Sequence, residues 1–306
     1  MDEDFEGELE SEERLELEPK DVADDLIAAD SSWEGGGSIQ LSSGKVWRPD
    51  LVRDDRSALL HVHLADRLRS YAITRFELAL EGGIEVHVAT TLGRLYDNEL
   101  LTQLAAADAL VHVIKDDAPP RRVLAVLADA GMTVPPDVRS RLAGHGLTFA
   151  AGSGTADQKG KRFEALVAFL LSQVEGFSIF ERNYKTSTEE IDVIIQRRGI
   201  DSRVWSLTNA PFLLAEAKNH ADGISQHMFS TFRVKMQTKR STVRIGLMLS
   251  RTTVSGAAIE QESKFASDEL TIVFLDGDKI AEWADATDGT GFLESMVSQA
   301  MLGGTT

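Results

Sequence analysis

Short apolar runs rich in β-branched residues alternate with helix-like periodicity in the first half of the chain. Four runs have the length and composition of buried strands, at 45–52, 58–64, 84–89 and 109–114. Apolar residues return at helical spacing between and after them, over 65–80, 98–107, 121–131 and 138–143. Alternation of this kind is typical of βαβ units, so residues 45–146 are predicted to form a small α/β domain around a parallel sheet.

The second half of the chain has a different order of elements, which begins with a helix and continues with three strands. After a segment at 144–160 that is rich in small residues and has little periodicity, a second domain is predicted over 155–302. Its strands are expected at 177–184, 190–196, 212–218, 243–250 and 270–275. Its helices are expected at 161–174, 226–240, 256–267, 279–283 and 291–301.

The charge of the chain is concentrated at its N-terminus. The 306 residues carry a net charge of −17, and residues 1–30 hold 14 acidic and two basic side chains, which is −12 of that total. So little apolar surface predicts that residues 1–44 form a disordered acidic arm, which ends in a Gly/Ser-rich linker at 31–45. The arm is either a solubilising tail or an intramolecular mimic of nucleic acid that shields a basic groove. The overall acidity therefore does not exclude a nucleic-acid partner.

Composition excludes several classes of protein. The chain has no cysteine, which excludes a disulfide framework, thiolate catalysis and cysteine-ligated metal centres. No apolar run approaches the length of about 18 residues that a membrane span needs. The N-terminus lacks the basic and apolar regions of a secretory signal. A soluble cytoplasmic protein with no membrane partner is expected.

Three acidic residues and one lysine of the second domain stand where a charge is paired or unusual. Glu216 and Lys218 end the apolar run FLLAEAK, and residues two apart on a strand point to the same face. Asp192 lies in the apolar run IDVII, where a carboxylate is costly unless it is paired or binds a metal ion. If the two strands form a hairpin, Asp192 and Glu216 converge on one hard cation such as Mg²⁺. Glu164 lies in the predicted helix that begins the domain, and a structural ion pair between Glu216 and Lys218 is the alternative.

The order of these groups resembles the PD-(D/E)XK nuclease superfamily, and more closely its Mrr-type restriction endonuclease branch. The matching stretches cover roughly half of the chain and are GKRFEALVAFLL (160–171), EEIDVII (189–195), FLLAEAKN (212–219), VRIGLMLS (243–250) and LTIVFLDGDKIAEW (270–283). The resemblance implies an α/β fold whose C-terminal domain has a restriction-endonuclease-like αβββαβ core with a mixed sheet. Two features depart from the family pattern: residues 187–190 replace a Gly-rich lead, and 24 residues separate Asp192 from Glu216.

The resemblance also implies roles for individual residues. Asp192 and Glu216 would hold Mg²⁺ or Mn²⁺, with the carbonyl of Ala217 as a further ligand. Lys218 would be the catalytic lysine. Glu164 would complete the site or hold a second metal ion.

The predicted helix after the Glu-x-Lys strand is basic. Residues 231–244 contain no acidic side chain, and residues 151–250 carry a net charge of +4 within this acidic protein. Such a local reversal of charge is what contacts with phosphate groups require, and a solvated helix face is the alternative. The predicted nucleic-acid contacts are Arg233, Lys235, Lys239, Arg240 and Arg244. The same helix carries Gln237, at a place where the family often has a glutamine that faces the site.

The predicted first domain imitates the order of the second. The segment 47–52, a turn and the run LLHVHLAD precede a long helix, and His61-Val62-His63 stands where Glu-x-Lys would stand. We therefore consider that this domain is a degenerate, catalytically inactive relative of the nuclease core or a recognition module of similar build. An unrelated α/β domain used for recognition or oligomerisation is the alternative. Simple parallel βαβ connections with no antiparallel pair of strands at 46–64 would contradict the duplication. A metal site at His61 and His63 is a further alternative.

Together these features predict a metal-dependent DNA endonuclease that hydrolyses phosphodiester bonds. The resemblance implies restriction or defence against foreign or modified DNA. The alternatives are a nuclease that processes repair or junction intermediates and a non-catalytic DNA-binding regulator on a nuclease scaffold. Because a double-strand cut usually needs two such sites, a homodimer is also expected.

Overall fold

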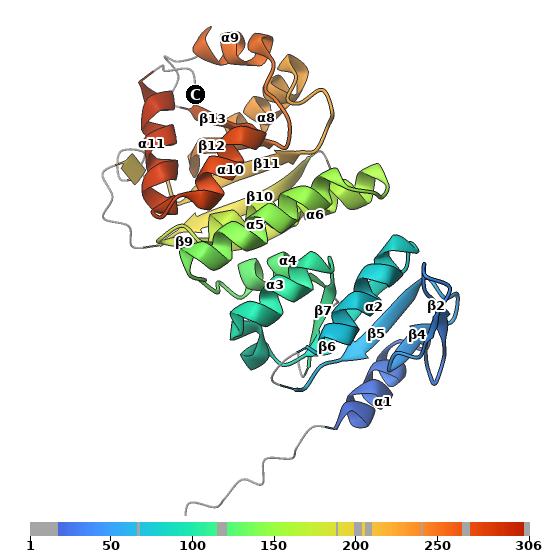
Figure 1. Ribbon diagram of the computed structural model, residues 1–306. Helices are drawn as coiled ribbons and strands as arrows, with labels where there is room; N and C mark the ends of the chain where they lie inside the picture. Colours follow the sequence, from blue (N-terminus) through green and yellow to red (C-terminus); the bar gives the residue numbers. More distant parts are fainter. Residues whose placement is uncertain are drawn as a thin grey trace, which may run out of the picture.

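The computed structural model describes residues 18–65, 68–114, 121–187, 189–198, 204–205, 210–239, 241–264 and 270–302. These residues form two mixed sheets in separate parts of the molecule, and helices α5 (Pro136–Ala151) and α6 (Ala156–Ser172) lie side by side between them (Figure 1). A two-stranded hairpin accompanies the first sheet. Among the described helices, none is both long and apolar enough to cross a lipid bilayer.

The N-terminal sheet has six strands in the order β1-β4-β5-β6-β7-β8. They are β1 (Trp33–Gly35), β4 (Leu51–Arg53), β5 (Ala58–Val62), β6 (Glu85–Thr90), β7 (Leu110–Val113) and β8 (Arg121–Arg122), and the hairpin pairs β2 (Ile39–Gln40) with β3 (Val46–Trp47). The helices are α1 (Pro19–Ala29), α2 (Ser70–Glu81), α3 (Asn98–Ala106) and α4 (Val123–Asp129), with a 3-10 turn at Leu92–Tyr96. Strands β5, β6 and β7 are parallel, as the alternating pattern predicts, whereas β4 runs antiparallel to β1 and to β5.

Part of the segment predicted to be a disordered arm and linker is folded, so the prediction is wrong for residues 19–45. Val22 of α1, Trp33 of β1 and Ile39 of β2 are all buried in the N-terminal domain. Gly36 and Gly44 adopt φ of 72° and 78°, a left-handed conformation that glycine reaches without steric cost, so these residues make tight turns between short strands. Each element contributes one or two buried side chains. The low average apolar content of the segment, on which the prediction of disorder was based, does not reveal them. Residues 1–17 lie outside the described residues.

The C-terminal sheet has five strands in the order β13-β12-β11-β10-β9. They are β9 (Phe177–Lys185), β10 (Glu190–Arg197), β11 (Phe212–Lys218), β12 (Val243–Ser250) and β13 (Thr271–Leu275), and the helices after α6 are α8 (Gln226–Thr238), α9 (Gly256–Lys264), α10 (Gly277–Asp285) and α11 (Gly289–Met301). Strand β10 is antiparallel to β9 and β11, whereas β11, β12 and β13 are parallel. This mixed sheet confirms the predicted αβββαβ core.

The junction between the two predicted domains is helical and not a linker, which corrects the boundary expected at 144–160. Helix α5 continues to Ala151, and α6 begins at Ala156 behind a capping box in which Thr155 and Gln158 exchange hydrogen bonds. Gly146 allows the close approach, because a β-carbon there would lie 2.9 Å from Leu124 and 3.1 Å from Leu166. One apolar core therefore runs from the N-terminal sheet through α4, α5 and α6 into the C-terminal sheet.

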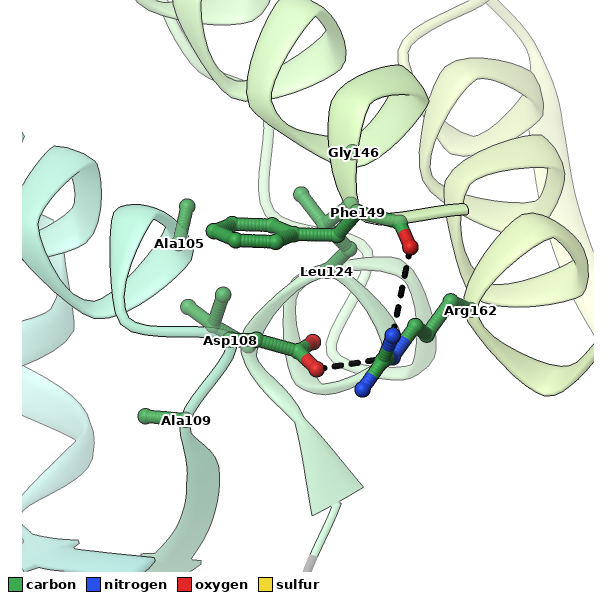
Figure 2. Close-up of a pocket in the computed structure, with 8 residues that line it drawn as sticks. Ala105, Asp108, Ala109, Leu124, Gly146, Phe149 and Arg162 are labelled. Carbon is green, nitrogen blue, oxygen red and sulfur yellow. Dashed lines mark hydrogen bonds and ion pairs between the residues drawn. The ribbon is translucent and has the colours of Figure 1, made fainter. Parts of the chain in front are cut away.

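A buried ion pair also joins the two halves. The Asp108 carboxylate, just before β7, lies 2.8 Å from Nε of Arg162 on α6 (Figure 2). The same carboxylate lies 3.3 Å from Arg122. Arg162 also donates a 3.2 Å hydrogen bond to the carbonyl of Phe149 at the end of α5. Because burial costs each charge its hydration, the pair holds α6 against the N-terminal sheet only while both partners are present.

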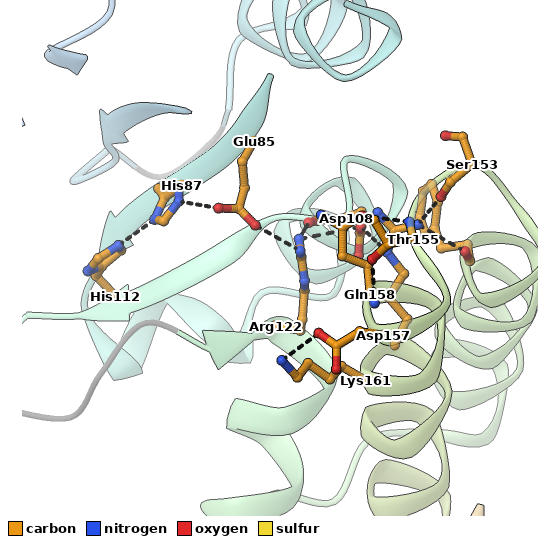
Figure 3. Close-up of polar contacts among 12 residues, drawn as sticks. Glu85, His87, Asp108, His112, Arg122, Ser153, Thr155, Asp157, Gln158 and Lys161 are labelled. Carbon is orange, nitrogen blue, oxygen red and sulfur yellow. Dashed lines mark hydrogen bonds and ion pairs between the residues drawn. The ribbon is translucent and has the colours of Figure 1, made fainter. Parts of the chain in front are cut away.

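Two of the strand histidines belong to the same polar network. His112 and His87 are 2.9 Å apart, His87 lies 3.2 Å from Glu85, and Glu85 lies 3.1 Å from Arg122 (Figure 3). Burial lowers the pKa of His112 to about 4, so its ring is neutral at physiological pH. Within the described part of the chain no group of three or more His, Cys, Asp or Glu gathers to hold a metal ion. We therefore interpret His87 and His112 as hydrogen-bonded structural residues.

Candidate active site

The hairpin of β10 and β11 brings the two strand carboxylates together. Val193 pairs with Ala215 in the antiparallel register, so Asp192 and Glu216 stand opposite each other one position further along. Residues directly opposite on neighbouring antiparallel strands project to the same face. The 23 residues between them, which made the register uncertain from sequence, therefore do not separate the two side chains.

Asp192 is buried, with 7% of its surface exposed, and is oriented by the backbone. Its Oδ2 accepts a 2.7 Å hydrogen bond from the N–H of Ala217 and lies 3.9 Å from Nζ of Lys218. Burial, and then the neighbouring Glu216 carboxylate, raise the pKa of Asp192 to about 7. A carboxyl group that is costly to ionise in the protein alone is suited to receive a cation, which would stabilise its charged form.

Two ammonium groups hold Glu216, and the second was missed as a member of the site. Lys218 Nζ lies 2.8 Å from Oε1 of Glu216, and Lys235 Nζ on α8 contacts both carboxylate oxygens at 2.8 and 2.9 Å. Burial disfavours the charged form of Lys218, but Glu216 and Asp192 outweigh it and raise its pKa above the ordinary value. Lys218 is therefore an ammonium donor at neutral pH and not a general base.

Glu164 lies on α6 beside this group without a direct bond to it. The carboxyl is half-buried, and burial raises its pKa although Arg182 and Lys218 favour the charged form. Glu164 opens into a groove of about 1130 Å³ between the N-terminal domain, α6 and β9. The groove is more acidic than basic, since Glu85, Asp129, Asp157, Glu164, Glu181 and Glu190 outnumber Arg122, Lys161, Arg182 and Lys185.

Gln237 does not face the site, contrary to the prediction. It is exposed on α8, two residues after Lys235. Consecutive helical residues are about 100° apart, so side chains at positions 235 and 237 point in nearly opposite directions. Lys235 takes the place beside the carboxylates that the sequence pattern assigned to Gln237.

The predicted basic surface of α8 is also largely absent. Arg233 is 5% exposed and interacts with Glu262, which lies on α9. Lys235 contacts Glu216, and Lys239 forms an ion pair with Glu189. These three side chains were predicted to bind nucleic acid, but each is engaged within the protein, Arg233 with α9 and the two lysines with carboxylates at Glu216 and Glu189. Arg244 on β12 is half-buried, and Arg240 lies outside the described residues.

The donor set fits a hard divalent cation that keeps water and substrate oxygens among its ligands. Asp192 and Glu216 provide two adjacent, nearly buried carboxylates, and Mg²⁺ is commonly bound by one or two carboxylates together with phosphate oxygens. The Ala217 N–H points at Asp192, and the N–H and C=O of one strand residue leave on the same edge, so its carbonyl faces that side as well. The Lys235 and Lys218 ammonium groups hold Glu216 in place and balance its charge.

The five-stranded sheet and its helices match a restriction-endonuclease-like core of the PD-(D/E)XK type. Residues 155–284 match the family model Mrr_cat, described as a restriction endonuclease. The C-terminal half of the chain therefore carries a catalytic domain of the Mrr-type restriction endonuclease family, as the sequence motifs predicted. No curated protein and no solved structure matches the chain.

Proposed function

We propose that the protein is a divalent-metal-dependent endodeoxyribonuclease that hydrolyses phosphodiester bonds in DNA. The observation that carries the proposal is the buried pair Asp192 and Glu216 with the Lys218 ammonium 2.8 Å from Glu216. The family match to restriction endonucleases supports a role in restriction or defence against foreign or modified DNA. A homodimer that brings two sites to the two strands is part of the proposal.

We assign the proposed roles of the residues from their contacts. Asp192 and Glu216, with the carbonyl of Ala217, would hold Mg²⁺ or Mn²⁺, which supplies Lewis-acid activation of water and neutralises phosphate charge. The Ala217 N–H fixes the orientation of Asp192. Lys218 donates hydrogen bonds to a non-bridging phosphate oxygen and stabilises the charge that develops on it. Lys235 is a positioning residue, because it holds Glu216 from α8.

Glu164 would complete the site from the helix side. Its raised pKa and its position on the groove support a role for this carboxyl beside the bound substrate. A second cation held at Glu164 would also offset the acidity of the groove, which otherwise repels a polyanion.

A plasmid cleavage assay tests the proposed function. Supercoiled plasmid, methylated and unmethylated, is incubated with the full-length protein in Mg²⁺, Mn²⁺ or EDTA, beside a branched duplex substrate. We expect cleavage of plasmid with either metal ion and none in EDTA. Cleavage in EDTA contradicts the proposal, and preference for the branched substrate supports a repair or junction nuclease instead. Binding without cleavage of any DNA supports the non-catalytic regulator.

The cleavage rate is expected to depend on pH through Asp192. Its pKa is raised to about 7 in the metal-free protein, and only the ionised carboxylate binds a cation. At limiting Mg²⁺ the rate should therefore rise as pH increases through neutrality. Higher Mg²⁺ should move the midpoint to lower pH, because the cation competes with the proton. Initial rates across the neutral range at two Mg²⁺ concentrations measure this, and a midpoint independent of Mg²⁺ contradicts it.

A further inference from the structure

The N-terminal sheet repeats the topology of the nuclease sheet. Strands β1, β4, β5, β6 and β7 are neighbours in that order, with two antiparallel pairs followed by two parallel pairs. Strands β9 to β13 show the same sequence of directions. Helix α1 precedes the first strand as α6 does, and α2 and α3 make the two crossovers that α8 and α9 make. The hairpin of β2 and β3 is an insertion between the first two strands.

The layers correspond as well as the strand order. Helix α1 packs on one face of its sheet with Leu60 and Val62, whereas Leu59 belongs to the core on the side of α2 and α3. In the nuclease sheet, Ala215 and Ala217 belong to the core on the side of α6, and Leu214 belongs to the core on the side of α8. The strands before the first crossover, β5 and β11, therefore turn their alternate side chains towards corresponding helices in the two sheets.

A hydrogen bond at the centre of the nuclease site recurs in the N-terminal domain. Leu51 pairs with Leu60 in the antiparallel register, so Asp50 stands opposite His61 one position further along. Asp50 Oδ2 accepts a 2.8 Å hydrogen bond from the Val62 N–H, the counterpart of the 2.7 Å bond from Ala217 to Asp192. Asp50 and Asp192 are thus equivalent positions.

The groups around Asp50 differ from those of the nuclease site. His61 stands where the nuclease has Glu216, and His63 stands where it has Lys218. The side chain of His61 lies 2.8 Å from Asp50 and packs on Phe76 of α2. The second carboxylate that a hard cation needs is therefore missing at this position.

The pKa values of the two equivalent aspartates are shifted in opposite directions. Burial opposes ionisation of Asp50, but hydrogen bonds from His61 and Val62 outweigh it and lower its pKa, whereas the pKa of Asp192 is raised to about 7. Asp50 is already compensated by protein groups.

The same end of β5 opens into a pocket of about 190 Å³ that has one arginine and a helix N-terminus at its edge. His61, His63, Arg69 and the first turn of α2 line it together with the apolar residues Pro19, Val62, Leu64 and Ala65. The N–H groups of a helix N-terminus and an arginine beside it attract phosphate groups. His63 is 3% exposed, and its Nε2 has no hydrogen-bond partner among the residues that the structure describes.

We propose that the N-terminal domain is a second, non-hydrolytic copy of the nuclease core, whose former active-site position at His63 and Arg69 binds a backbone phosphate of DNA without a metal ion. The choice of DNA as the source of the phosphate rests on the proposed function. Replacement of Glu and Lys by His removes the metal-binding carboxylate and leaves a neutral hydrogen-bond donor next to a guanidinium and a helix N-terminus. The pairing of the two copies in one chain gives the substrate a second contact beyond the catalytic site.

Fluorescence anisotropy of a labelled duplex tests this proposal in the full-length protein. The Asp192→Asn chain is used in EDTA, so that the DNA stays intact and no divalent ion is present. His63→Gln with Arg69→Gln is expected to weaken binding on the order of tenfold and to reduce the salt dependence of log K by about one. Arg69→Gln alone, at an exposed position, is expected to give part of the loss without affecting folding. Arg141→Gln, an exposed arginine outside the pocket, is the matched control and should change neither quantity.

Competitors identify the source of the phosphate. Inorganic phosphate and a mononucleotide are expected to displace the duplex only weakly, because they make one contact where DNA makes several. Displacement by inorganic phosphate as effective as that by unlabelled duplex overturns the assignment to DNA. Unchanged DNA affinity in the double variant contradicts the proposed phosphate site. The proposal is also contradicted if the two residues contribute to DNA affinity only when a divalent ion is present.

Cleavage kinetics separate this inference from the proposed function. In the chain with Asp192 intact, the double variant is expected to raise KM and leave kcat unchanged. If the protein cleaves no DNA but loses binding with His63 and Arg69 replaced, the proposed function fails and the phosphate site stands. If cleavage depends on Asp192 while KM is unaffected by the double variant, the function stands and the phosphate site fails.

Discussion

Plasmid cleavage is expected to fall on the order of 10²–10³-fold when Lys218 is replaced by methionine, and to be lost with Asp192→Asn. Lys218 Nζ lies 2.8 Å from Glu216 and 3.9 Å from Asp192, so this ammonium reaches a phosphate oxygen held at the two carboxylates. Removing it leaves the developing charge without its nearest protein donor. Asp192→Asn removes one of the two carboxylates that would hold the cation. Initial rates at saturating Mg²⁺ measure both effects.

Unfolding measurements provide the control for these variants. The raised pKa of Asp192 means that its ionisation costs stability in the metal-free protein as pH rises above the ordinary value of 3.8. Asp192→Asn is therefore expected to unfold at the same temperature as wild type, or higher, above neutral pH, and the difference should vanish in acid. Lys279 is exposed, forms an ion pair with Glu282 and lies far along the chain from Asp192 and Lys218. Lys279→Met should therefore leave cleavage intact. Full cleavage by Lys218→Met contradicts the assigned role.

Gly223→Ala is expected to lower the free energy of unfolding by at least about 2 kcal/mol and to reduce cleavage as well. Gly223 has φ of +72°, and a β-carbon there would overlap the carbonyl oxygen of Thr253. The next residue, Ile224, donates a 3.0 Å hydrogen bond to that same carbonyl. The turn connects the end of β11, which carries Lys218, to α8, which carries Lys235. A displacement of this turn therefore disturbs both ammonium groups at Glu216.

Two other glycines separate the causes of that loss. Gly36 has the same φ of +72° but open space around a β-carbon, so Gly36→Ala measures the backbone strain alone. Gly93 has open space and no positive φ, so Gly93→Ala should change stability little. Denaturant unfolding of the three variants gives the comparison. Equal losses for Gly223→Ala and Gly36→Ala contradict the proposed clash.

The nuclease core was predictable because its signals are local. Strands such as FLLAEAK carry nearly continuous apolar runs, and a strand period of two puts Glu216 and Lys218 on one face whatever surrounds them. The short motifs in their order then indicated the family, which the match over residues 155–284 confirms. The meeting of Asp192 with Glu216 depended on a hairpin register that the sequence suggested but did not determine.

The features that sequence reasoning missed depend on contacts between distant segments. A run of basic residues on one helix has the same composition whether it faces solvent or the sheet, and only the packing of α8 turns Lys235 to Glu216 and Arg233 to Glu262. Gly146 is typical of a linker by composition, yet in α5 it permits close packing on Leu166.

The sequence alone determined that this chain contains a restriction-endonuclease-like domain and singled out two carboxylates and a lysine as its candidate site, because those groups follow from strand periodicity and order. Tertiary structure decided how the rest of the chain relates to that domain. Strand order and direction showed that the N-terminal sheet repeats the nuclease topology, and the Val62 N–H to Asp50 bond placed His61 and His63 at the position of Glu-x-Lys. Sheet topology is a property of pairings between strands far apart in the chain, and no local pattern of apolar and polar residues specifies it.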